Sequence, residues 1–157
     1  MAYPDGFTYV SGPYEIRRFN VLSTATFKAR VPLEMGPART VRESITSETF
    51  LVGIAMNDAA NSIYGSEILV MVPNSQTVFA TICDTGLAAS ALSAGFSYNY
   101  KKSGNNFRID TASQASARVT IVPRGDGTTI NSADSSIHVQ FLQNFIYPYN
   151  SNASITF

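Results

Sequence analysis

Few residues of this chain combine the side-chain chemistry and the spacing that catalysis requires. His138 is the only histidine, and it alternates with apolar neighbours in a strand-like stretch, so we expect it to face away from the core. Asp134 lies just before that stretch, but nothing specifies a nucleophile that would complete a catalytic triad. Cys83 is the only cysteine; it ends an apolar run and is followed by Asp84, which predicts a small buried side chain rather than a nucleophile.

The sequence also lacks the groups of nearby residues that a metal site, a phosphate-binding loop or a catalytic pair of carboxylates would need. The aspartates from Asp58 to Asp134 are scattered, and Glu43 and Glu48 could meet across a turn without any sign of a substrate cleft. Residues 124–127, Arg-Gly-Asp-Gly, contain an adhesion tripeptide, but this is also the composition of an ordinary turn after a strand. They lack the remaining glycine and the helix of a phosphate loop. We therefore expect no catalytic residue, no metal, no cofactor and no enzymatic activity.

The composition is that of one small domain that belongs to an assembly. The 157 residues suffice for one domain and one core. Charged residues make up 14% of the chain, and 11 Lys and Arg balance 11 Asp and Glu, so the net charge is zero. This balance favours association and argues against nucleic acid as a partner. The chain shows neither a signal peptide nor a long apolar run, so we expect a protein made in a bacterial cytoplasm with no membrane partner.

Short strand patterns between turn residues predict an all-β fold. The clearest strand is 136–142, in which Ile137, Val139 and Phe141 share one face. Two apolar runs joined by Pro-Asn-Ser-Gln, 67–72 and 77–82, are expected to form a central hairpin. Further strands are expected at 49–55 and 117–123, and one short helix at about 86–94.

A second hairpin is predicted from residues 96–102 and 107–110, which alternate around a turn at Ser-Gly-Asn-Asn. Basic and aromatic residues interleave in this hairpin, a pattern that can also bind single-stranded nucleic acid. We expect the aromatic residues to face the core and the charges to face solvent. The residues concerned are Lys101, Lys102 and Arg108, with Tyr98, Tyr100 and Phe107.

The two ends of the chain differ from this central part. Residues 1–20 interleave aromatic residues with glycine and proline, which predicts an extended N-terminal arm before a single β domain at 21–146. Residues 136–146 are expected to be the last core strand. Residues 147–157 are expected to leave as a C-terminal arm, because Pro148 cannot donate a ladder hydrogen bond. The alternative, in which the tail completes its own sheet, stays open.

One stretch of the chain resembles a known family. Residues 39–82, RTVRESITSETFLVGIAMNDAANSIYGSEILVMVPNSQTVFATI, contain a strand that reaches Gly-Ile-Ala, an Asp-Ala turn, a valine-rich strand, a turn and another strand. With the continuation SYNYKKSGNNFRIDTASQASARVTIVPR, residues 97–124, this order resembles the capsid decoration, or cement, proteins of tailed bacteriophages. The resemblance covers Arg39 to Phe141.

The resemblance implies a small β-barrel or β-tulip-like domain that binds the outer surface of an icosahedral phage head. Such a protein joins and stabilises neighbouring major capsid subunits, usually as a homotrimer at three-fold or quasi-three-fold positions of the virion. Aromatic anchors in the arms, and the start of a basic segment at 17–42, are then expected to contact partners. The expected contacts are Tyr3, Phe7, Tyr9, Tyr14, Arg17, Arg18, Tyr147, Tyr149 and Phe157.

Three other functions remain open at this point. Another phage structural part, such as a head-fibre base, a tail-tube subunit or a tail-tip module, would share the all-β, low-charge composition, and its position in the particle would distinguish it. A carbohydrate-binding module would need a platform of exposed aromatic residues, but the chain has no Trp. An enzyme would show an activity that is lost on the substitution His138→Ala.

Overall fold

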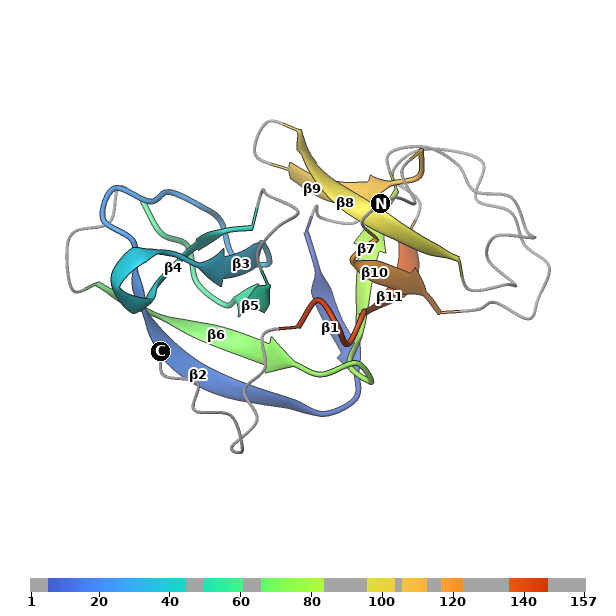
Figure 1. The fold of residues 1–157 in the computed structure, drawn as a ribbon, viewed down its shortest axis with the longest axis horizontal. Helices are drawn as coiled ribbons and strands as arrows, with labels where there is room; N and C mark the ends of the chain where they lie inside the picture. Colours follow the sequence, from blue (N-terminus) through green and yellow to red (C-terminus); the bar gives the residue numbers. More distant parts are fainter. Residues whose placement is uncertain are drawn as a thin grey trace.

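The computed structural model describes residues 6–44, 50–60, 66–83, 96–103, 106–112, 117–122 and 136–146 (Figure 1). Within these ranges the chain is nearly all β, as the sequence predicts, and its strands form a closed five-stranded barrel and a six-stranded sheet. The predicted small barrel is thus confirmed. The helix expected at 86–94 lies outside the described residues.

The barrel is formed by strands that follow one another in the first half of the chain. In Figure 1, β2 and β6 run side by side along the lower side of the barrel, and they pair antiparallel from Tyr14 opposite Pro73 to Asn20 opposite Glu67. A short 3-10 turn, η1 (Pro37–Arg39), connects β3 to β4. The order around the wall is β2 (Tyr14–Val21), β4 (Thr40–Glu43), β3 (Pro32–Met35), β5 (Leu51–Ala55) and β6 (Glu67–Pro73).

The six-stranded sheet stands beside the barrel and is antiparallel at every described pairing (Figure 1). An isolated bridge between Cys83 and Ile109 brings its last strand back towards the end of β7. The predicted hairpin at 96–110 is present as β8 and β9. The order is β1 (Thr8–Ser11), β7 (Val78–Ile82), β11 (Ser136–Phe141), β10 (Val119–Ile121), β8 (Ser97–Ser103) and β9 (Asn106–Asp110).

The barrel is an insertion between two neighbouring strands of the sheet. β1 pairs with β7, with Ser11 opposite Val78, and all five barrel strands lie between them in the sequence. The predicted hairpin between 67–72 and 77–82 is therefore wrong, because β6 belongs to the barrel and β7 to the sheet. Both runs are strands joined by a turn, but each is hydrogen-bonded to other partners. An apolar pattern indicates a strand without indicating which strand it pairs with.

The two connections between the barrel and the sheet lie against each other. Gly12 has a φ of +96°, and a Cβ at this position would lie 2.5 Å from the carbonyl oxygen of Gln76. The hydroxyl of Thr77 donates a hydrogen bond to the carbonyl of Pro13, and the Asn74 amide donates to the Thr77 hydroxyl at 3.0 Å. Glycine at position 12 therefore serves both a left-handed turn and a close backbone approach.

A single apolar core extends through the barrel and the sheet. The ring of Phe7 lies 5.0 Å from that of Phe141 and 5.7 Å from that of Tyr100, measured between centroids, and these aromatic contacts occupy the junction of the two parts. The predicted alternation of the last strand is confirmed, since Ile137 and Val139 are buried and His138 is exposed. The core therefore depends on contacts between residues far apart in the sequence.

The expected N-terminal arm is wrong for residues 7–20. Phe7 is 1% exposed, and the chain from Thr8 onwards forms β1 and β2. The glycines that suggested an irregular arm permit tight packing instead: a Cβ at Gly6 would lie 2.7 Å from the carbonyl oxygen of Arg30. Residues 1–5 lie outside the described part of the chain.

The expected last strand at 136–146 is shorter in the structure. β11 ends at Phe141, a turn follows, and Ile146 forms a parallel bridge with Leu51 of the barrel. Phe145 and Ile146 are both buried, so this turn belongs to the core although it is not a strand. The proposed C-terminal arm, 147–157, lies outside the described residues.

Candidate partner-binding surface

An exposed aromatic pair lies where β1 passes into β2. Tyr9 is 37% exposed and Tyr14 is 44% exposed, and their ring centroids lie 4.8 Å apart in an edge-to-face arrangement. The hydroxyl of Tyr9 donates a hydrogen bond of 2.7 Å to the carbonyl of Gly12. This bond holds the Tyr9 ring against the turn, and the Tyr14 ring packs on it, so less conformational entropy would be lost at Tyr9 when a partner covers the pair.

Alternation along β2 extends this pair into a larger apolar surface. Phe19 and Val21 point into the barrel, whereas Tyr14 and Ile16 lie on the outer side, where Ile16 is 50% exposed. Ile16 is opposite Met71 of β6, which is only partly buried. We call Tyr9, Tyr14, Ile16, Leu69 and Met71 the outer apolar face. Contiguous exposed apolar residues of this kind mark interaction sites in soluble proteins.

A small apolar pocket adjoins the outer apolar face. It has a volume of about 170 Å³ and lies between the barrel and β1. Tyr9 and Met71 belong to both the face and the pocket, so a side chain entering the pocket would also touch the face. The other main lining residues are Phe7, Arg30, Met56 and Phe79.

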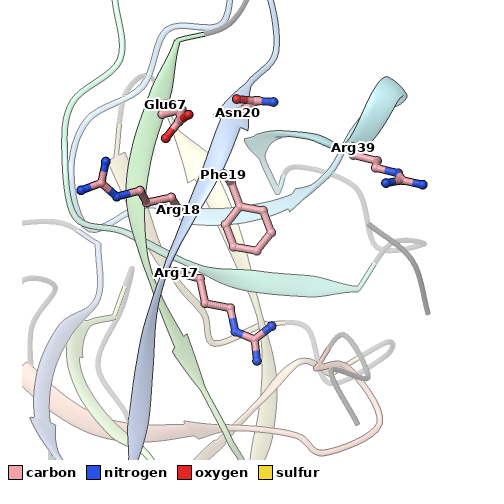
Figure 2. A pocket seen from close by; sticks show the side chains of 6 residues that line it. All are labelled: Arg17, Arg18, Phe19, Asn20, Arg39 and Glu67. Atoms are coloured by element: carbon pink, nitrogen blue, oxygen red, sulfur yellow. The ribbon is translucent and has the colours of Figure 1, made fainter. Parts of the chain in front are cut away.

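A larger pocket of about 390 Å³ lies at the other end of β2. Figure 2 shows Arg17 and Phe19 on one side of β2, Arg18 on the other side near Glu67, and Arg39 on the adjacent turn η1. Arg17 and Arg18 diverge because successive side chains of a strand point to opposite faces. We call this the arginine pocket; its lining residues are Arg17, Arg18, Phe19, Asn20, Arg39 and Glu67.

The arginine pocket carries more positive charge than its carboxylates balance. Arg17 forms an ion pair of 2.8 Å with Glu15 on its own strand. Within the described ranges, neither Arg18 nor Arg39 has an ion pair or a side-chain hydrogen bond. Arg39 has a φ of +61°, and the turn that presents it is closed by a 2.6 Å hydrogen bond from the Thr40 hydroxyl to the carbonyl of Pro37.

A cluster of mostly buried polar side chains lies between the barrel and the sheet. Glu34 is fully buried and accepts a 2.9 Å bond from Arg42. The hydroxyls of Tyr100 and Ser44 are 2.7 Å apart, and burial raises the pKa of Tyr100 to about 12. Arg118 is 4% exposed, and its guanidinium carbon lies 4.6 Å from the centre of the Tyr100 ring. Glu34, Ser44, Tyr100 and Arg118 are buried, whereas the Arg42 side chain is 40% exposed, so the cluster reaches solvent at Arg42. The Ser44–Tyr100 contact joins the two parts of the fold.

The structure separates the expected partner contacts into three groups. Tyr9 and Tyr14 lie on the outer apolar face, and Arg17 and Arg18 line the arginine pocket farther along β2. Phe7 is wrong as a contact, because its ring lies at the centre of the aromatic core. The remaining residues lie outside the described part of the chain: Tyr3, Tyr147, Tyr149 and Phe157.

The other residues that the sequence analysis considered as candidate functional residues have structural roles where the structure describes them. Cys83 is fully buried, as predicted. The aromatic residues of the β8–β9 hairpin are buried, and Lys102 forms an ion pair with Glu43. Asp58 accepts a 2.7 Å bond from the amide of Ala29, which lowers the pKa of that carboxyl. Residues 124–127 lie outside the described ranges.

Sequence reasoning missed several residues of the two surfaces. Arg39 was visible as part of a basic segment, but Arg18, which lines the same pocket, is 21 positions away in the sequence (39 − 18). Ile16 and Met71 meet only because β2 pairs with β6. Alternation along β2 was the one available signal, and the glycines and prolines that precede it, up to Pro13, concealed it.

Neither comparison with known proteins nor a search for metal-binding groups and membrane-spanning helices assigns a function to the chain. No protein-family model and no curated protein matches the chain. In the part of the chain that the structure describes, no three His, Cys, Asp or Glu residues gather in a group that could hold a metal ion. No helix among those residues is long and apolar enough to cross a membrane. The function is therefore inferred from the residues and their arrangement.

Proposed function

We propose that this chain is a non-enzymatic structural protein of a tailed-bacteriophage particle. It binds the outside of the icosahedral head and stabilises contacts between major capsid subunits. The observation that supports this most is the outer apolar face, in which Tyr9, Tyr14 and Ile16 are exposed and the two tyrosine rings pack against each other. The resemblance of residues 39–82 to decoration proteins supplies the identity of that partner.

The chemistry of the surface suits permanent assembly. Tyrosine and other large apolar residues dominate the energetics of protein interfaces, because they bury much area with few rotatable bonds. Each such residue contributes about 25 cal/mol for every Å² of apolar area removed from water. A homotrimer at a three-fold position would present three copies of the face, and multivalency would then slow its release.

Co-sedimentation with bare phage heads tests the proposal. The purified protein is mixed with expanded heads and, separately, with unexpanded heads of the phage that encodes it. We expect saturable binding to expanded heads, at a stoichiometry that matches the local three-fold positions. Absence of binding to both forms would contradict the proposal and favour a tail or fibre component.

Two matched variants connect the binding to the outer apolar face. Ile16→Ser removes an exposed apolar side chain from this face, and Phe96→Ser removes one from the residue just before β8 of the six-stranded sheet, where Phe96 is 42% exposed. We expect Ile16→Ser to weaken head binding about tenfold and Phe96→Ser to leave it unchanged, with both variants folded. Equal binding by the wild type and Ile16→Ser would place the contact elsewhere on the molecule.

A further inference from the structure

The arginine pocket holds two cations that the rest of the described chain does not neutralise. Arg18 and Arg39 are exposed and lack ion pairs among the described residues, and the backbone at Arg39 is held by a closed turn. Arginine is suited to carboxylates, because its planar guanidinium donates two parallel hydrogen bonds to them. The pocket therefore has the chemistry of a receptor for acidic groups.

The directions of the side chains decide what kind of acidic group fits. Figure 2 shows the guanidinium of Arg18 above the β6 side of β2 and that of Arg39 on the η1 side, pointing away from it. The two groups do not converge on one point, so they would not hold a single small anion between them. Two carboxylates that are separated along an extended chain match this arrangement.

The surroundings favour a protein segment over a nucleic acid. Glu67 lines the pocket and Glu15 lies two residues before Arg17, so a continuous row of phosphates would meet carboxylates as well as arginines. Arg18 also shares the outer side of β2 with Ile16 and Tyr14. A bound chain that continues along β2 would place apolar side chains on the outer apolar face.

We propose that the arginine pocket binds an extended segment of a partner protein that carries two separated acidic side chains next to apolar residues. Arg18 and Arg39 each bind one carboxylate, and the outer apolar face receives the apolar residues. The inference rests on the proposed function only for the source of the segment, which would be the major capsid protein.

Peptide binding tests the inference without heads. The probe is a fluorescent peptide of about ten residues that carries two separated Glu residues and, on the same side of the extended chain, Val at every second position beside them. The control peptide has Gln in place of both Glu residues. We expect the Glu peptide to bind the full chain with an affinity that falls as salt is raised, and the Gln peptide to bind more weakly. Equal binding of the two peptides, or no binding of the Glu peptide at millimolar concentration, would overturn the proposal.

Variants that each remove one positive charge test whether the peptide binds at the arginine pocket. Arg18→Gln and Arg39→Gln are each expected to weaken binding of the Glu peptide about twofold to fivefold, as is typical of exposed charge pairs. The matched control Lys28→Gln removes one positive charge outside the pocket, where Lys28 lies 3.6 Å from Asp58, and it should leave binding unchanged. An equal loss in all three variants would show unspecific attraction and sink the proposal. Tighter binding of a single-stranded oligonucleotide of equal charge would do the same.

Head binding by the same variants separates this inference from the proposed function. If heads bind the wild type and the double variant Arg18→Gln, Arg39→Gln equally, the inference fails for the capsid while the proposed function stands. If heads bind neither protein but the peptide effects are as expected, the proposed function fails and the acidic-segment site stands.

Discussion

The buried hydroxyl of Tyr100 makes the stability of the fold sensitive to alkaline pH. Burial raises the pKa of Tyr100 from 10.0 to about 12, so the unfolded chain releases this proton at a lower pH than the folded chain does. The associated stability is complete below pH 10 and is lost as the pH rises towards 12. Two pKa units correspond to about 2–3 kcal/mol.

Tyr100→Phe is therefore expected to flatten the fall in stability between pH 10 and 12, measured by urea unfolding at each pH. At neutral pH the variant should be less stable by about 1–3 kcal/mol, because the Ser44 hydroxyl loses its buried partner. Some slope should remain, since burial also raises the pKa of Tyr98. Tyr14→Phe, at an exposed position, is the control, and a pH dependence of Tyr100→Phe identical to that of the wild type would contradict the prediction.

At this scale, sequence reasoning succeeds where a residue obeys alternation and fails where it depends on distant partners. The exposed side of β11 and the burial of Cys83 follow from the local pattern. The burial of Arg118 does not, because it depends on an aromatic ring at Tyr100 and another at Phe145, each contributed by a different part of the chain. A charged residue in the core has no sequence signal without knowledge of its neighbours.

Among the elements, β1 is held to the fold by the aromatic ring that precedes it. Phe7 contacts the rings of Phe79, Tyr100 and Phe141, whereas Tyr9, two residues later, faces solvent. We expect Phe7→Ala to lower the free energy of unfolding by about 3–5 kcal/mol.

Tyr9→Ala is the matched comparison, and it should cost less than about 1 kcal/mol. Urea unfolding followed by circular dichroism measures both variants. Similar losses would mean that β1 is held by its surface contacts rather than by its anchor in the core. A small loss for Phe7→Ala alone would show that the aromatic cluster tolerates a cavity at this position.

Strand positions could be predicted from the sequence because apolar alternation and turn residues are local signals. The pairing of each strand with its neighbours could not be predicted from these local signals. The runs that became β6 and β7 have a turn between them and apolar residues throughout, which are the features of a hairpin. The close approach of Gly12 to Gln76 explains how the chain changes from the barrel to the sheet there, and that contact spans 64 residues (76 − 12).

At the scale of the whole molecule, the question is whether the tail after Ile146 contributes to the stability of the fold or to binding of a partner. Phe145 and Ile146 are buried and complete the described core, so we expect a chain that lacks 147–157 to keep its thermal midpoint within a few degrees. Its binding to heads should fall, because the apolar tail is proposed as a partner contact. Calorimetry and co-sedimentation of the truncated chain measure the two effects, and unfolding of the truncated chain would make the tail part of the core.

The insertion of the barrel between β1 and β7 has a mechanical consequence. A force that draws the barrel away from the sheet is carried along the chain by two connections, Gly12–Pro13 and Asn74–Thr77, which are joined by the bond from Thr77 to Pro13. Since Ser11 and Val78 are opposite each other, both connections pull their strands in the same direction. The tension then passes as shear to the ladder between β7 and β11, whose hydrogen bonds must break together rather than one after another. The six-stranded sheet is therefore loaded in the geometry in which its ladder resists force as one unit.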